Sequence, residues 1–123
     1  ERVKLISLKV CSETGEIPHA RVVLSVDEKE LAGDATGSGP VDAAFKAIES
    51  MVNTESELQL YSVNAITSGT DAQGEVTVRI QKNGGILDGQ GADTDIVIAS
   101  AKAYVNAVNK LDQAHKAHPQ GQV

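Results

Sequence analysis

The sequence contains no tryptophan, one phenylalanine and two tyrosines, so aromatic side chains contribute little to its hydrophobic content. The core must come mainly from valine, isoleucine, leucine and alanine, and hydrophobic residues still make up 41% of the chain. That share and the 23% of charged residues are ordinary for a globular protein. At 123 residues the chain has the length of one domain with a core of its own.

Cysteine and basic residues are also scarce. Cys11 has no partner for an internal disulfide, so we expect a cytoplasmic protein, and its place in a strand-like run predicts a small buried thiol. The net charge of −6 argues against nucleic acid as a partner, because phosphate binding needs a basic face. No apolar run approaches the roughly 18 residues of a membrane span, so we expect no membrane partner. Because the chain opens on Glu1, we expect it to be a piece of a longer protein.

What the sequence does contain is a weak internal repeat. Identical residues recur at an offset of 56 positions: Gly33 and Gly89, Val41 and Val97, Ala43 and Ala99, Lys46 and Lys102, Ala47 and Ala103. Upstream, residues 5–10 align with residues 60–65, which matches Leu5 with Leu60 and Ser7 with Ser62. The order of elements is therefore expected to be the same in both halves.

Each half is predicted to contain three strands followed by a helix. Ile6, Leu8 and Val10 alternate with polar side chains, as is typical of a half-buried strand, and Asn83-Gly84 is a strong hairpin turn signal. Apolar residues at helical spacing predict the two helices. The predicted strands cover 5–10, 20–26, 30–35, 59–66, 75–80 and 86–91, and the predicted helices cover 40–52 and 96–111.

This order predicts an α+β fold built from tandem βββα units that form an internal pseudo-dimer, with antiparallel sheets that carry helices on one side. The two units cover about residues 4–52 and 58–111. A unit of about 55 residues is marginal alone, so the halves should pack against each other. The domain then spans residues 1–111, and residues 112–123 are expected to form a flexible tail.

The sequence holds no catalytic constellation: it has no nucleophile elbow, no P-loop and no paired cysteines. Two histidines in residues 115–118 fall in the expected tail, and the acids of residues 93–95 are more simply a helix cap, so we expect no metal or other cofactor in this domain.

The stretch GSGPVDAAF indicates a candidate binding site. Its glycines precede Pro40 at a helix start, and a helix N-terminus with little side-chain bulk suits an anion. The candidate binding site is the pair of helix starts at 37–42 and 93–96, in a non-catalytic ligand-binding or assembly domain.

Three stretches carry a resemblance to a known family. In order they are GSGPVDAAFKAI, LYSVNAITSGTDAQGEVTVRI and GQGADTDIVIASAKAYVNAVNKL, and together they resemble the C-terminal regulatory domain of the 2-isopropylmalate synthases. The likeness covers about residues 4–111. It implies a tandem βββα pseudo-dimer that forms a homodimer and binds L-leucine as a feedback inhibitor of leucine biosynthesis. Catalysis in that family occurs on a separate (β/α)8 barrel, which uses a divalent metal to condense acetyl-CoA with 2-oxoisovalerate, so the resemblance implies a regulatory part of an acyltransferase without catalytic residues.

The resemblance also implies which residues bind the effector. They are Gly37 and Gly39 of a G-x-G-P loop, Val41 and Asp42 after its proline, Tyr61 in a strand, Ala65 four positions later, and Asp95 and Ile96 at the second helix start. By residue alone, Tyr61 is more simply a core side chain with a polar tip. The chemistry of the set suits leucine, because a helix N-terminus binds a carboxylate, an acid binds an ammonium and apolar side chains bind an isobutyl group.

Three alternatives remain open at this point. The related domain of the citramalate synthases is regulated by isoleucine, which differs from leucine only in the position of a branch. The chain can also be an assembly module without a ligand, or an amino-acid sensor that is not attached to a synthase. The stretch YSVNAITSGTDAQGEV is more similar to the leucine branch.

Overall fold

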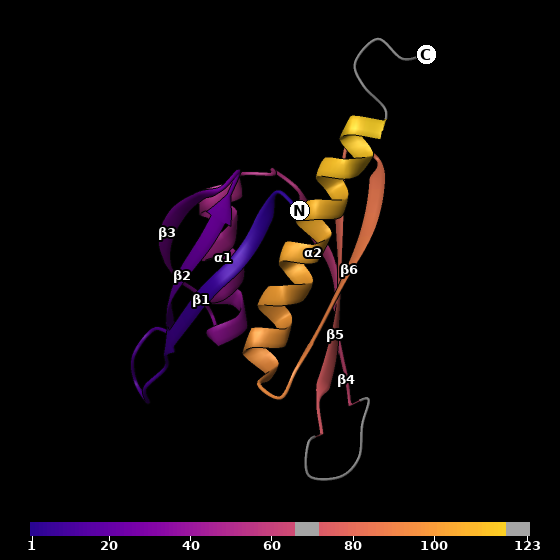
Figure 1. The fold of residues 1–123 in the computed structure, drawn as a ribbon. Helices are drawn as coiled ribbons and strands as arrows, with labels where there is room; N and C mark the ends of the chain where they lie inside the picture. Colours follow the sequence, from indigo (N-terminus) through magenta and orange to yellow (C-terminus); the bar gives the residue numbers. More distant parts are fainter. Residues whose placement is uncertain (66–71, 118–123) are drawn as a thin grey trace.

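The computed structural model describes residues 1–65 and 72–117, and its elements follow the predicted order in both halves (Figure 1). The first half contains β1 (Val3–Cys11), β2 (His19–Val26), β3 (Lys29–Thr36) and α1 (Pro40–Val52). The second half contains β4 (Glu57–Ala65), β5 (Gly74–Lys82), β6 (Gly85–Asp93) and α2 (Ile96–Ala117). The predicted α+β fold of two βββα units is confirmed, and so are the bounds of the first helix.

Each unit forms an antiparallel three-stranded sheet, with β2 or β5 in the middle. The second hairpin of each sheet turns through two residues with positive φ, Asp27 (52°) and Glu28 (68°) in one half, Asn83 (52°) and Gly84 (81°) in the other. Two residues of positive φ give the turn whose twist matches that of the flanking strands. The hairpin predicted at Asn83-Gly84 is therefore confirmed.

The first strand of each sheet carries a bulge. In β1 the pairing shifts between Leu5 and Ser7, which leaves Ile6 out of register and 53% exposed. The expected alternation of Ile6 with Leu8 and Val10 is wrong, because the extra residue shifts the phase and Leu5 packs against the core instead. Strand alternation also carries Cys11 away from the covered face, so this thiol is exposed and its expected burial is wrong.

The strand register, with its bulges, matches residues of the two halves differently from the alignment of their sequences. Leu5 lies opposite Leu24, and Leu58 lies opposite Ile80, which is the equivalent of Leu24 at the offset of 56 residues. Leu5 therefore corresponds to Leu58, whereas the sequence alignment matched it with Leu60. The error is a shift of two residues, which keeps every side chain on the same face of the strand, so alternation alone does not reveal it.

Each helix packs on its own sheet, α1 on β2 and β3 and α2 on β5 and β6. Figure 1 shows α2 between the two sheets, where it also contacts β1 and α1. One continuous hydrophobic core therefore spans both halves, as the sequence predicts for units of marginal size. Its largest fully buried aliphatic side chains are Leu24, Ile48, Ile80, Val3, Val22, Val76, Val78 and Val108.

The second helix is longer than predicted. It continues past the expected end at Leu111 to Ala117, and Asp112 forms an ion pair with Arg2 at 2.7 Å. Residues 112–117 are thus helical rather than part of the expected tail, because a contact from the opposite end of the chain holds this turn. Residues 118–123 lie outside the described part of the chain.

Neither helix in the described ranges is both long and apolar enough to cross a membrane.

Candidate functional site

The first helix begins without a side-chain cap. Gly39 is its N-cap residue, with extended backbone angles (φ −161°, ψ 176°), and no side chain bonds to the cap. Pro40 follows at the first helical position, and the first helical hydrogen bond runs from the N–H of Ala43 to the carbonyl of Gly39 at 2.9 Å. The N-terminal N–H groups and the positive end of the helix dipole therefore meet no carboxylate at the cap itself.

Asp42 in the first turn holds the preceding loop. Its Oδ2 accepts the N–H of Ser38 at 2.9 Å and pairs with the ammonium of Lys46 at 3.1 Å. The N–H of Ser38, more than Lys46, holds the pKa of Asp42 below its ordinary value. The carboxylate of Asp42 is therefore ionised at neutral pH. Its bonds to Ser38 and Lys46 both use Oδ2.

The two glycines of the loop have different roles. A Cβ on Gly37 would lie 2.5 Å from the backbone nitrogen of Ala43 and 2.5 Å from Oδ2 of Asp42, so a larger residue cannot pack here without moving the helix start. A Cβ on Gly39 would meet nothing within 4 Å. Gly37 thus lets the loop pack on α1, and Gly39 leaves open space in front of the helix N-terminus.

The second helix, unlike the first, begins with a side-chain cap. Oδ1 of Asp95 accepts the N–H groups of Val97 at 2.8 Å and Ile98 at 3.3 Å, and Oδ2 of Asp93 accepts the N–H of Asp95 at 2.9 Å. Asp93 also pairs with Lys102, and these bonds, the N–H of Asp95 first, lower the pKa of Asp93. The cap interpretation of residues 93–95 is confirmed. The two helix starts are consequently not equivalent, because a carboxylate of the chain already occupies the second.

Other metal-ligating residue types do not gather in the described residues: no three His, Cys, Asp or Glu side chains there are placed to share an ion. The side chains of His115 and His118 lie outside the residues whose side chains are described.

All three aromatic residues of the chain meet between α1, β4 and α2. The ring of Phe45 lies 5.9 Å from that of Tyr61, edge to face, and 4.8 Å from that of Tyr104. The hydroxyl of Tyr61 is 2.8 Å from Oγ of Ser100, and the hydroxyl of Tyr104 donates to Glu49 at 3.2 Å. Burial, with Glu49, raises the pKa of Tyr104. Tyr61 is 36% exposed, so its ring forms the solvent edge of the cluster.

Phe45 and Ser100 connect the expected site residues. Phe45 follows Val41 by one turn on the same face of α1, and Oγ of Ser100 donates to the carbonyl of Ile96 at 2.7 Å. Since Tyr61 contacts both Phe45 and Ser100, it links the start of α1 to the start of α2. Neither connecting residue is among the site residues predicted from the sequence, although a serine on the apolar face of a helix is a signal for one of them.

The remaining site residues fall into two groups. Ala65 lies opposite Gly74 in the sheet, and a Cβ on Gly74 would collide with the Cδ1 atom of Ile96, so these three residues are neighbours. By contrast, the carboxylates of Asp42 and Asp95 bond to backbone N–H groups of their own helix starts. The structure therefore places Gly74 next to both Ala65 and Ile96, and it engages the two acids locally.

An uncovered apolar strip lies beside Tyr61 on β4. Leu58 and Val63 are the equivalents of Leu5 and Val10 by register, yet they are 48% and 44% exposed, whereas Leu5 and Val10 pack on the core. We call Leu58, Tyr61 and Val63 the open face of β4. Contiguous exposed apolar side chains of this kind often mark interaction surfaces.

Comparison with known proteins identifies the family. A family profile described as the LeuA allosteric (dimerisation) domain matches residues 1–112, which is nearly the whole chain. The chain belongs to the LeuA allosteric domain family. As a LeuA domain it combines an uncapped first helix, an aromatic cluster and an open strand face.

The LeuA domain described here is 68% identical over 121 residues to the 2-isopropylmalate synthase of Methylococcus capsulatus. It is 67% identical to that of Nitrosococcus oceani and 62% identical to that of Thiobacillus denitrificans. Each match covers 98% of the LeuA domain and 24% of the relative. The chain thus spans about a quarter of the length of these relatives, and it corresponds to their C-terminal region.

Proposed function

We propose that this LeuA domain binds L-leucine and thereby inhibits the 2-isopropylmalate synthase to which it is attached. The observation that carries the proposal is the start of α1, where the N-cap is a glycine and no side chain occupies the cap. In the whole enzyme a separate barrel with a divalent metal would condense acetyl-CoA with 2-oxoisovalerate, and this domain would supply the regulation. The names of the relatives favour leucine over the isoleucine of the citramalate synthases.

The geometry supports one orientation of the effector. The carboxylate of leucine would accept N–H groups at the start of α1, which Gly39 leaves open. Ser38 and Lys46 both bind Oδ2 of Asp42, so we assign the ammonium of leucine to its Oδ1. The isobutyl group would lie toward Val41 and the ring of Tyr61.

Calorimetry on the purified chain tests the proposal. We expect L-leucine to bind, and L-isoleucine and L-valine to bind at least about tenfold more weakly, because a pocket discriminates branched side chains by shape, at about 1–3 kcal/mol. Binding of isoleucine alone would assign the chain to the citramalate branch. If none of the twenty amino acids gives a heat of binding, the remaining alternative is an assembly module without a ligand.

We also propose that two copies of the domain associate through the open face of β4, in keeping with the family description. In sedimentation at tens of micromolar we expect a dimer, and we expect Leu58→Lys to shift it to monomer because a charge would be buried in the contact. Ile86→Lys is the matched control, since Ile86 is 58% exposed and belongs to β6 rather than β4. A wild-type monomer at all concentrations would contradict the proposal.

A further inference from the structure

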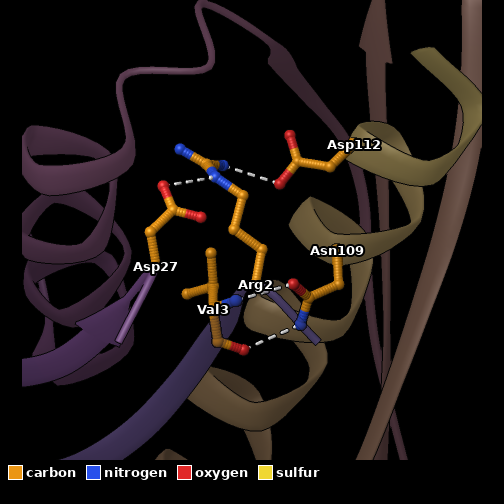
Figure 2. Close-up of polar contacts among 5 residues, drawn as sticks. All are labelled: Arg2, Val3, Asp27, Asn109 and Asp112. Atoms are coloured by element: carbon orange, nitrogen blue, oxygen red, sulfur yellow. Dashed lines mark hydrogen bonds and ion pairs between the residues drawn. The ribbon is translucent and has the colours of Figure 1, made fainter. Parts of the chain in front are cut away.

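The first residues of the chain are fastened to the second half of α2 (Figure 2). Val3 donates its N–H to Oδ1 of Asn109 at 2.9 Å, and Nδ2 of Asn109 donates to the carbonyl of Val3 at 2.8 Å. Arg2 donates to Asp112 at 2.7 Å and to Asp27 at 3.2 Å. We call these five residues the N-terminal clamp. It joins the beginning of β1, which belongs to the first half, to the long helix of the second half.

Two hollows adjoin the residues of the clamp. One, of about 390 Å³, is lined by Val3, Lys4 and Asn109, among others. The other, of about 570 Å³, is lined by Arg2 and Asp112, among others. Val3 itself is fully buried, so the polar side chains beside these hollows, and not the side chain of Val3, have room to rearrange.

The same helix reaches the candidate effector site. Its first turns carry Ile96 and Ser100, which bonds to Tyr61, and its later turns carry Asn109 and Asp112. From Ile96 to Asn109 an α-helix rises by about 20 Å. Continuous backbone hydrogen bonds make such a helix move as one body, so a displacement of its first turns is carried to the clamp.

The two halves hold their incoming strands with different residues. Asn53 is the equivalent of Asn109 at the repeat offset, but α1 ends there and Asn53 adopts a left-handed conformation, with φ 48°. The segment that enters β4 is held instead by Glu49 of α1, whose carboxylate accepts the N–H of Glu55 at 2.9 Å. The second helix continues through Asn109, whose buried amide bonds to both the N–H and the carbonyl of Val3. Each half therefore has a polar hold on its incoming strand, and the hold on β1 uses both backbone groups of one strand residue.

We propose that the N-terminal clamp transmits effector binding from the start of α2 to the segment that precedes residue 1 in the full enzyme. The inference rests on the proposed function, since it requires leucine as the effector. When leucine contacts Tyr61, which bonds to Ser100 of α2, the helix shifts, and Asn109 and Asp112 carry Arg2 and Val3 with them. The side chains beside the two hollows then rearrange, which changes how the attached catalytic part is held.

A chimera tests this relay: the Methylococcus capsulatus synthase with its matched C-terminal region replaced by this chain. Arg2→Gln removes both ion pairs of the clamp, and Asn109→Asp keeps the shape of the side chain but loses its donor to Val3. We expect the leucine concentration for half-inhibition to rise by at least about tenfold in each variant, within the usual range of allosteric coupling. Basal turnover should stay at the wild-type level, and the leucine Kd of the isolated chain should change by less than about threefold.

Arg79→Gln is the matched control. It breaks an Arg–Asp pair of similar length, Arg79 with Asp88 at 2.8 Å, which lies within one sheet and includes no residue of the clamp. We expect it to leave inhibition unchanged. Hydrogen exchange supplies a readout on the unmodified chain, where saturating leucine should change the protection of the Val3 amide.

The outcomes separate the two proposals. If the wild-type chain binds leucine but the clamp variants are inhibited like wild type, the relay is wrong and the proposed function stands. Unchanged protection of the Val3 amide on leucine binding would also overturn the relay, even if a variant fails to fold. If the wild-type chain binds no leucine, the proposed function is wrong and the relay falls with it.

Discussion

Gly39→Asp is expected to weaken leucine binding by at least about tenfold, which is about 1.4 kcal/mol, and to leave the melting temperature of the free domain near that of wild type. Asp95 shows what the new side chain would do, because at the start of α2 it accepts the N–H groups of Val97 and Ile98. A carboxylate on Gly39 would occupy the equivalent groups of α1 and repel that of leucine.

The fold should tolerate the change. The backbone of Gly39 is extended, a conformation that any residue adopts, and its Cβ would meet nothing within 4 Å. Aspartate is also a good N-cap residue. In the full enzyme the variant should keep its turnover and lose feedback inhibition.

Gly39→Ala is the control for this experiment, because it adds the Cβ without the charge. We expect its leucine affinity to stay within about threefold of wild type. Calorimetry and a thermal melt on both variants decide the matter. A folded Gly39→Asp domain with wild-type affinity would show that the start of α1 is not the carboxylate site.

The second large effect is expected at Gly89, where β6 approaches α2. Gly89→Ala should lower the free energy of unfolding by about 3 kcal/mol or more, because overpacking against rigid backbone is destabilising. The new Cβ would collide with the carbonyl oxygen of Ala103 and the nitrogen of Ala107, and would lie 2.7 Å from the Cβ of Ala107. None of these atoms can move without displacing the helix from its sheet.

Gly33 is the matched position in the first repeat. A Cβ there would lie 2.9 Å from the carbonyl oxygen of Ala47 and 3.0 Å from both Oγ of Ser50 and Cγ of Met51. It would approach one backbone atom, and less closely than at Gly89, so we expect Gly33→Ala to cost less, about 1 kcal/mol. Urea unfolding of both variants measures the difference. Equal destabilisation at the two positions would contradict the close approach of β6 and α2.

Several features of the fold could be predicted because their signals are local. Pro40 after two glycines gave the start of α1, and Asn83-Gly84 gave a hairpin turn, since both depend on the backbone preferences of adjacent residues. The cap at Asp95 was equally readable, because an aspartate bonds to N–H groups two and three residues later.

The bulge at Ile6 and the end of α2 could not be predicted in the same way. A bulge depends on the partner strand, and the sequence of β1 alternates equally well without it. Helix α2 continues beyond Leu111 because Asp112 meets Arg2 from the opposite end of the chain. Composition suggested a tail there, and a contact distant in sequence overrode it.

The sequence by itself determined the order of the elements, the repeat and the residues at both helix starts, because these follow from periodicity and from bonds between near neighbours. Only the tertiary structure decided that the start of α1 is open, since no other part of the described chain comes within 4 Å of a Cβ placed on Gly39. It alone also placed Tyr61 between Phe45 and Ser100, because these contacts join three elements across the core and leave no pattern within any one of them.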